Sequence, residues 1–191
     1  MREDLEIKLV EKYPEIFRDY NGNIMQSAMP WGFEHGDGWY DIIDALCSAI
    51  MSPVRGARRH LENVNTMLAK PEDQKAKWND WMHKTYNETA RAEAERKLQE
   101  AEGSIPVAVQ VKEKFGGLRF YIDKGNDMVY ALIAMAEHLS IRTCEVCGKM
   151  GSKTYHTGWH RTLCHDHAVE QYGEAEVADY EKDEGNDYGP F

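Results

Sequence analysis

The sequence has little of what secreted and membrane proteins require. Its longest uninterrupted apolar run, from Met128 to Ala136, is far too short to cross a bilayer. The first six residues, Met1 to Glu6, are mostly charged and contain no apolar signal region. The chain has four cysteines, three of them between positions 144 and 164, unlike the dispersed cysteine pairs of a disulfide scaffold. We therefore expect a cytoplasmic protein that has no membrane association.

Positive charge is also scarce, because 23 basic residues face 33 acidic ones and the net charge is −10. The imbalance is uneven: positions 171–191 hold seven carboxylates and one lysine, which leaves −4 for the rest of the chain. This charge disfavours non-specific binding to phosphate, although a nearly neutral body can still carry a local basic patch. With 42% apolar residues, the chain has enough hydrophobic material to bury a core.

Hydrophobic periodicity predicts two helices in the first fifty residues. The first ends at Pro14, since proline cannot continue a helix. The second carries an amphipathic stripe that includes Trp39, Ile43 and Leu46, and we expect this stripe to lie in the core. Cys47 lies in the same helix, where a free thiol behaves as a small buried hydrophobe.

Two further helices are predicted beyond Pro53. One runs from Val54 to Leu68, and the other from about Glu72 to Glu102. The buried start of the second should be marked by Trp78, Trp81, Met82 and Tyr86. We expect the two helices to form a hairpin, residues 54–102, that is inserted into the surrounding domain.

After this hairpin the hydrophobic period changes from helix to strand. Apolar residues alternate from Ile105 to Val111 and again from Leu118 to Ile122, and Gly116-Gly117 lies between the two runs. This pattern predicts a β-hairpin, and the apolar helix 128–139 should pack on it. The fold class is therefore α+β, with a core domain at 1–140, a metal module at 141–172 and an acidic tail at 173–191.

Two pairs of metal-ligand residues predict a zinc site. Cys144 and Cys147 are three apart and precede a glycine, as in a zinc knuckle. Seventeen residues after Cys147, Cys164 and His167 repeat the spacing at the predicted start of a helix. Four such ligands suit tetrahedral Zn²⁺, and the order of knuckle, hairpin and helix resembles a treble-clef finger. His165 is the alternative fourth ligand, but its position next to Cys164 would strain the chelate.

Four protein ligands indicate a structural zinc, since catalytic zinc sites keep one position open. A zinc deaminase would need a glutamate beside its first zinc ligand, in a His-x-Glu arrangement, and this pattern of ligands has none. His156, His160 and His165 raise the alternative of a nuclease of the His-Asn-His type. Such a nuclease needs a further Asp-His pair on the hairpin for its hydrolytic metal, and the sequence offers none there.

Three groups of side chains are candidates for contact with a partner, although each also suits a solvated surface. One is the basic cluster Arg55, Arg58 and Arg59, and another is the outward pair Arg119 and Tyr121 on the predicted hairpin. The third lies in the acidic tail, where aromatic residues punctuate the carboxylates: Tyr180, Asp183, Glu184, Tyr188 and Phe191. The aromatic and glycine-rich segment from Trp31 to Trp39 is either a functional surface or a loop that covers the core.

Three motifs together resemble a set of small uncharacterised proteins of bacteriophages and prophages. They are Gly36-Asp-Gly-Trp-Tyr40, Lys112-Glu-Lys-Phe-Gly-Gly-Leu-Arg-Phe-Tyr121 and Cys144-x-x-Cys-Gly148 with Leu163-Cys-x-x-His-Ala168. The resemblance implies a phage accessory protein in the cytoplasm of its bacterial host. Because the sequence offers no activated nucleophile or phosphate loop, we expect a non-enzymatic protein that binds a host macromolecule, with a host protein favoured and a nucleic acid as the alternative.

Overall fold

The structure is a computed structural model that describes residues 1–156 and 158–174. The chain divides into two compact units. Unit 1 combines Met1–Cys47 with the chain from Pro106 onward, and unit 2 is Ser48–Ile105. The predicted insertion, 54–102, lies within unit 2. Helices and strands are both present, so the predicted α+β class is confirmed.

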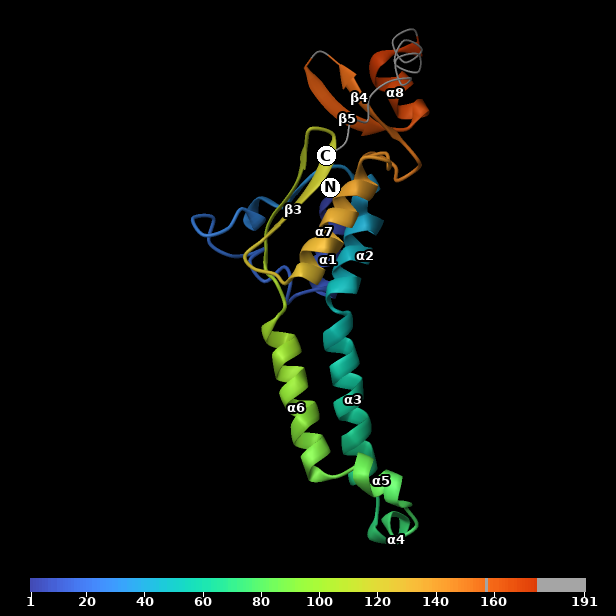
Figure 1. The fold of residues 1–191 in the computed structure, drawn as a ribbon. Helices are drawn as coiled ribbons and strands as arrows, with labels where there is room; N and C mark the ends of the chain where they lie inside the picture. The colour runs from blue at the N-terminus through green and yellow to red at the C-terminus, as the bar shows by residue number, and fades with distance from the viewer. Residues whose placement is uncertain (157, 175–191) are drawn as a thin grey trace. The chain divides into compact units, whose positions relative to one another are not determined.

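The first part of unit 1 is mainly helical (Figure 1). Helix α1 ends one residue before the Tyr13-Pro14 pair, in agreement with the proline signal. Helix α2 follows directly on a short 3-10 turn and carries the predicted apolar stripe. The elements in chain order are α1 (Glu3–Lys12), η1 (Met29–Trp31), β1 (Phe33–Glu34), η2 (Asp37–Trp39) and α2 (Tyr40–Ile50).

A three-stranded sheet with the order β1-β2-β3 forms the centre of unit 1. Strand β2 (Ala108–Lys114) pairs antiparallel with β3 (Gly117–Ile122), and β1 pairs parallel with β2. The turn between β2 and β3 places Phe115 at φ 55° and Gly116 at φ 77°. A left-handed phenylalanine is uncommon, and the Phe115 ring is 62% exposed.

The predicted first strand was placed too early in the sequence. Ile105 and Val107 are buried, but β2 begins only at Ala108, and the register shifts between Ala108 and Gln110. This irregularity takes Val109 out of the strict alternation that the sequence pattern indicated. The second strand follows its prediction, with Leu118 and Phe120 buried.

The core lies between the sheet and the helices that cover it. Helix α7 (Asp127–Ser140) packs on β3, as the apolar run predicted. The rings of Phe17 and Phe33 meet edge to face at 5.1 Å, an arrangement that aromatic pairs favour. The expected core stripe of α2 is confirmed, because Trp39 and Ile43 are fully buried and Leu46 is 4% exposed.

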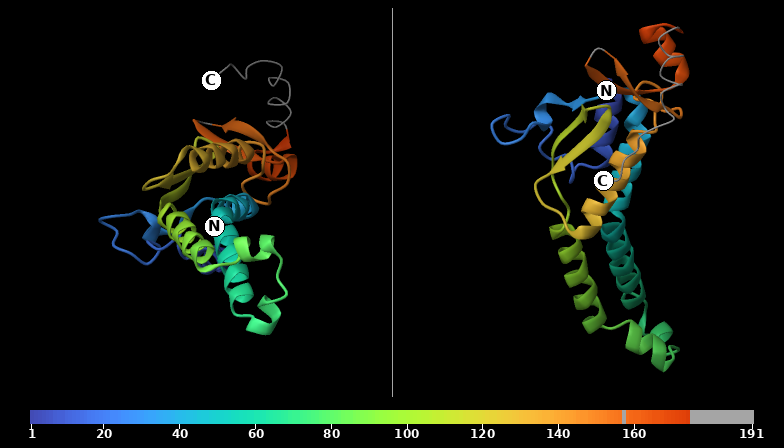
Figure 2. Two further views of the ribbon diagram at one scale, coloured as in Figure 1. Left: turned by 60° about the horizontal axis from the view of Figure 1, so that its bottom comes forward. Right: turned by 45° about the horizontal axis from the view of Figure 1, so that its top comes forward.

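Unit 2 contains the predicted helical hairpin, formed by α3 and α6, which lie side by side (Figures 1 and 2). The prediction of one long helix from Glu72 to Glu102 was wrong. The side chains of Asn79 and Asn87 accept hydrogen bonds from backbone N–H groups three residues later and so begin new helices. The expected buried start is also wrong, since Trp81 is 65% exposed. The helices are α3 (Ser52–Leu68), α4 (Glu72–Lys75), α5 (Asp80–Thr85) and α6 (Glu88–Gly103).

The last described elements of unit 1 follow α7. Strands β4 (Ser152–His156) and β5 (Trp159–Leu163) form an antiparallel hairpin, and helix α8 (His165–Tyr172) begins immediately after β5. The chain enters this hairpin through the turn that contains the first cysteine pair. The order of turn, hairpin and helix is the order that the ligand spacing predicted.

Candidate metal centre

The first two cysteines lie on a tight turn that hydrogen bonds close. The Cys144 N–H donates to the Lys149 carbonyl at 2.8 Å, and the Gly148 N–H donates to the Cys144 carbonyl at 2.9 Å. Gly148 has φ 75°, a conformation that glycine adopts without strain. The backbone folds back at this glycine, and the turn brings the Cys144 and Cys147 thiols within 4.8 Å of each other.

The second ligand pair is positioned by the junction of β5 and α8. Cys164 is the N-cap residue of α8, and its carbonyl accepts a hydrogen bond from the Ala168 N–H at 2.9 Å. His167 lies in the first turn of the helix, so its ring returns toward the cap. The spacing of three residues therefore brings an imidazole and a thiol to one side of the helix start.

The four predicted ligands meet at one point. The Sγ atoms of Cys144, Cys147 and Cys164 and a ring nitrogen of His167 all lie within 4.8 Å of one another. All three cysteines are free thiols. Within the part of the chain that the structure describes, this is the one group of three or more such side chains that could hold a metal ion. The group includes His167 and does not include the alternative ligand His165.

The local backbone also favours the ionised form of one ligand. Burial raises the pKa of Cys144, but the N–H groups of Cys164, Cys147 and Val146 stabilise its thiolate and bring the pKa down to about 7. For Cys147, burial and the neighbouring thiols raise the pKa. Thiolate is the form of cysteine that binds metals, so a cation entering the cluster would displace the remaining protons.

The core of unit 1 supports the cysteine turn through the segment before α2. The Gly38 N–H donates to the Glu145 carbonyl at 2.7 Å, and Trp39 Nε1 donates to the Thr143 carbonyl at 2.8 Å. A Cβ atom at Gly38 would lie only 2.1 Å from the Cys144 carbonyl oxygen. Close backbone contact is therefore the reason for glycine at this position. The segment from Trp31 to Trp39 thus packs against the cysteine turn, although Trp31 itself is 64% exposed.

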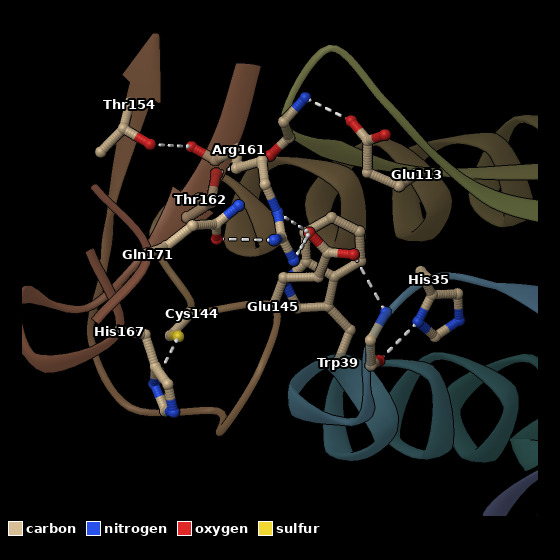
Figure 3. A network of polar contacts seen from close by, with 12 residues as sticks. His35, Trp39, Glu113, Cys144, Glu145, Thr154, Arg161, Thr162, His167 and Gln171 are labelled. Carbon is tan, nitrogen blue, oxygen red and sulfur yellow. Dashed lines mark hydrogen bonds and ion pairs between the residues drawn. The ribbon is translucent and has the colours of Figure 1, made fainter. Parts of the chain in front are cut away.

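A buried carboxylate connects the cysteine turn to the hairpin and to α8. Glu145 accepts from the Gly36 N–H at 3.1 Å and from the Arg161 guanidinium at 3.3 Å. The same guanidinium donates to Gln171 on α8 at 2.7 Å (Figure 3). Glu145 is 6% exposed, so this pair is shielded from screening by solvent. These contacts link the cysteine turn to the segment before α2, to β5 and to α8.

Aromatic side chains that the sequence analysis did not select gather near the tips of two hairpins. Trp159 is 74% exposed and Tyr155 51% exposed on the β4–β5 hairpin, and Phe115 is 62% exposed on the β2–β3 turn. The His160 ring contacts both Tyr155 and Phe115. We call these four residues the aromatic tip. The sequence signal was present, since Trp159 follows a glycine in the middle of the predicted metal-bound hairpin.

A cavity of about 320 Å³ lies beside the aromatic tip. Its walls combine aromatic rings with hydrogen-bonding side chains, a combination typical of recognition sites. The lining residues are Glu113, Glu145, His156, Trp159, His160, Arg161, Gln171 and Tyr172. His156 stacks on Tyr172 at 4.5 Å, and this contact places it in the wall of the cavity.

The other predicted contact residues do not belong to the ligand cluster. Arg55, Arg58 and Arg59 are on α3 in unit 2, where Arg58 forms an ion pair with Glu102 at 2.8 Å. On the β2–β3 hairpin, Arg119 pairs with Glu137 at 3.6 Å. The ring of Tyr121 lies beneath the Lys112 ammonium group. The predicted tail residues Tyr180, Asp183, Glu184, Tyr188 and Phe191 lie outside the described residues.

Comparisons with family models, with curated proteins and with solved structures found no match to this chain. Among the helices that the structure describes, none is both long enough and apolar enough to span a membrane. The cluster of three thiols and one imidazole is thus the feature that defines the site.

Proposed function

We propose that the Cys144, Cys147, Cys164 and His167 cluster binds one structural Zn²⁺ ion. In a tetrahedron with Zn–S of about 2.3 Å and Zn–N of about 2.0 Å, two sulfur atoms are about 3.8 Å apart and sulfur and nitrogen about 3.5 Å. The Cys147 and Cys164 Sγ atoms are 3.8 Å apart. The His167 Nδ1 atom is 3.5 Å from Cys144 Sγ and 3.2 Å from Cys164 Sγ. These separations fit zinc, and the thiolate-rich ligand set favours it over magnesium or calcium.

The role proposed for this ion is to hold the cysteine turn, the β4–β5 hairpin and α8 together. The buried cluster beside the ligands is small: Cys144, Leu163, Cys164 and Ala168, with Val169 and Tyr172 packed against it. A module with so few apolar contacts depends on its metal for folding. Elemental analysis of the purified protein tests this directly, with one zinc per chain expected. A protein that is folded at this end and free of zinc would refute the proposal.

We further propose that the protein is a non-enzymatic accessory protein of bacteriophage origin that binds a macromolecule of its bacterial host. The aromatic tip is the observation that supports binding. Tryptophan and tyrosine dominate the energetics of protein interfaces, and large exposed rings near the tips of two hairpins are costly unless a partner covers them. With four protein ligands, the proposed zinc leaves no position for a substrate, which favours binding over catalysis. The expected host setting rests on the resemblance of three motifs to those of phage proteins.

Capture from a bacterial lysate tests this role. Tagged protein should retain a specific host component, identified by mass spectrometry, and Trp159→Ala should lose it because the largest ring of the aromatic tip is removed. Trp81→Ala is the matched control, since Trp81 is also 65% exposed but lies on α5 in unit 2. Equal retention by the two variants would show that the aromatic tip is not the binding surface.

A nucleic acid is the second candidate partner, and local charge is the observation that favours it. Residues 110–121 belong to the β2–β3 hairpin, and residues 149–163 include the β4–β5 hairpin. Together these segments contain six lysine or arginine side chains and one carboxylate, Glu113. Lys114 lies over the Phe115 ring, and Lys153 is on β4. Exposed rings among basic groups can stack bases while the cations contact phosphates.

Salt dependence separates the two partners. If the nucleic acid is correct, affinity for a single-stranded oligonucleotide should fall steeply with salt, because each phosphate contact releases a counterion. Lys153→Ala should reduce that slope, whereas Trp159→Ala should weaken binding at every salt concentration and leave the slope unchanged. An absence of oligonucleotide binding at low salt would eliminate this candidate and leave the protein partner.

A further inference from the structure

The outward face of helix α7 is apolar and uncovered. Met128 is 67% exposed, Met135 56% and Leu139 49%, while the opposite face buries Val129 and Ile133 against the sheet. A helix on the surface of a monomer normally turns charged residues to the solvent. Several large apolar side chains in one stripe instead mark an interaction surface.

Within residues 127–142, the exposed side chains that carry a full charge lie at the two ends. Asp127 is exposed in the first turn and Arg142 is exposed just beyond the last. The exposed positions between them are Met128, Tyr130, Ala131, Ala134, Met135 and Leu139, with one imidazole, His138. Glu137 also lies between them, but it turns toward the sheet, where it accepts from the Phe120 N–H at 3.1 Å and pairs with Arg119.

An acid at one end and a base at the other make this face complementary to itself. If two copies of α7 pack antiparallel about a two-fold axis near Ala134, Asp127 of each copy faces Arg142 of the other. Met128 then lies near Leu139 of the second copy, and the small side chains of Ala131 and Ala134 allow the helix axes to approach closely. A two-fold axis is the commonest symmetry of protein dimers, and it requires such a self-complementary surface.

We propose that the protein forms a two-fold dimer through the outward face of α7, with the helices antiparallel. The occupant of the face is a second copy of the chain because the end charges match under a two-fold rotation, whereas an unrelated partner would not require this symmetry. The dimer carries two Asp127–Arg142 pairs and a continuous apolar strip between them. Since only one helix face per chain is buried, its association depends on protein concentration.

The first test is sedimentation equilibrium of the full chain with its metal, from about 1 µM to about 1 mM, the range in which small interfaces associate. The wild type should change from monomer to dimer within this range. Met135→Glu should remain monomeric, because it places two carboxylates in the apolar strip. Met25→Glu is the control, since Met25 is 86% exposed but lies outside α7. A monomeric wild type, or a Met135→Glu variant that still dimerises, would overturn the proposal.

A charge exchange tests the antiparallel arrangement. Asp127→Arg and Arg142→Asp should each weaken self-association by about tenfold, because each variant places two like-charge pairs in its own dimer. An equimolar mixture of the two variants should regain dimerisation close to that of the wild type, because every end charge then faces its opposite. A mixture that associates no better than the separate variants would exclude the antiparallel two-fold arrangement.

Discussion

Substitution of Gly38 by alanine tests whether the core of unit 1 holds the cysteine turn. The added Cβ would lie 2.1 Å from the Cys144 carbonyl oxygen and 2.5 Å from the Gly148 nitrogen. Both neighbours are backbone atoms, so a rotamer change cannot relieve the overlap. Reaching the ordinary contact distance of 3.4 Å from the oxygen requires a displacement of about 1.3 Å.

Such a displacement has two energetic consequences. Overpacking of a closely fitted site costs about 1–3 kcal/mol. The hydrogen bond from the Gly38 N–H to Glu145, 2.7 Å long, would also lengthen or break, at about 1 kcal/mol. Gly38→Ala should therefore lower the free energy of unfolding of unit 1 by about 2–4 kcal/mol. It should also accelerate the loss of zinc, because two of the thiol ligands lie on the displaced turn.

Urea denaturation and zinc release to a chromogenic chelator measure these two effects. Gly56→Ala is the matched control: an added Cβ there meets no atom within 4 Å, and Gly56 lies inside α3. This control should retain zinc at the wild-type rate and gain about 0.5–1 kcal/mol in stability, since alanine favours a helix over glycine. Wild-type stability and zinc retention in Gly38→Ala would refute the argument from close backbone contact.

Further predictions concern the metal, the core and pH. Cys147→Ser and His167→Ala should each lose zinc in elemental analysis and unfold the β4–β5 end, whereas His165→Ala should keep one zinc per chain. Leu46→Ala should cost about 2–5 kcal/mol in chemical denaturation, and a loss within error would mean that this face of α2 is not core. Burial lowers the pKa of His35 from 6.5 to about 4, so the folded state favours the neutral imidazole. This preference adds up to about 3 kcal/mol to the free energy of unfolding above pH 6.5, and the contribution is lost as the pH falls toward 4. His35→Phe should flatten the dependence of stability on pH between 4 and 6.5, and an unchanged dependence would contradict the burial argument.

Much of the fold could be predicted from the sequence, because the spacing of apolar residues along a helix or strand indicates which face is buried. The stripe of Trp39, Ile43 and Leu46 and the alternation around Phe120 identified core faces correctly, since each depends on neighbouring residues alone. The long helix across Asn79 was wrong because favourable helix residues on both sides obscured an N-cap that was visible in the sequence.

The ligands of the candidate site could be predicted from the sequence, but the contacts that hold the cysteine turn against the core could not. The repeated spacing of the cysteine and histidine pairs is a short-range signal, and the four residues lie together. The contact between Gly38 and the cysteine turn joins segments more than one hundred residues apart, and no local pattern encodes it. Nothing in the local sequence distinguishes Glu145 from other residues between two zinc-binding cysteines, although its carboxylate accepts hydrogen bonds from both Gly36 and Arg161. The aromatic tip depends on two hairpins that meet only in the folded chain.

The insertion of unit 2 has a consequence for the order in which the protein assembles. Trp39 and Thr143, which are hydrogen-bonded beside the cysteine turn, are separated by 104 positions, and more than half of the intervening chain belongs to unit 2. Helices α3 and α6 pack through contacts within unit 2, such as Arg58 with Glu102, so this unit can form before the remainder of the chain closes. Each halving of the effective loop length lowers the entropic free-energy cost of closing the loop by about 0.6 kcal/mol. Early formation of the helical hairpin would thus assist the closure that completes the metal-binding end, although the described residues of unit 2 contribute no ligand to the cluster.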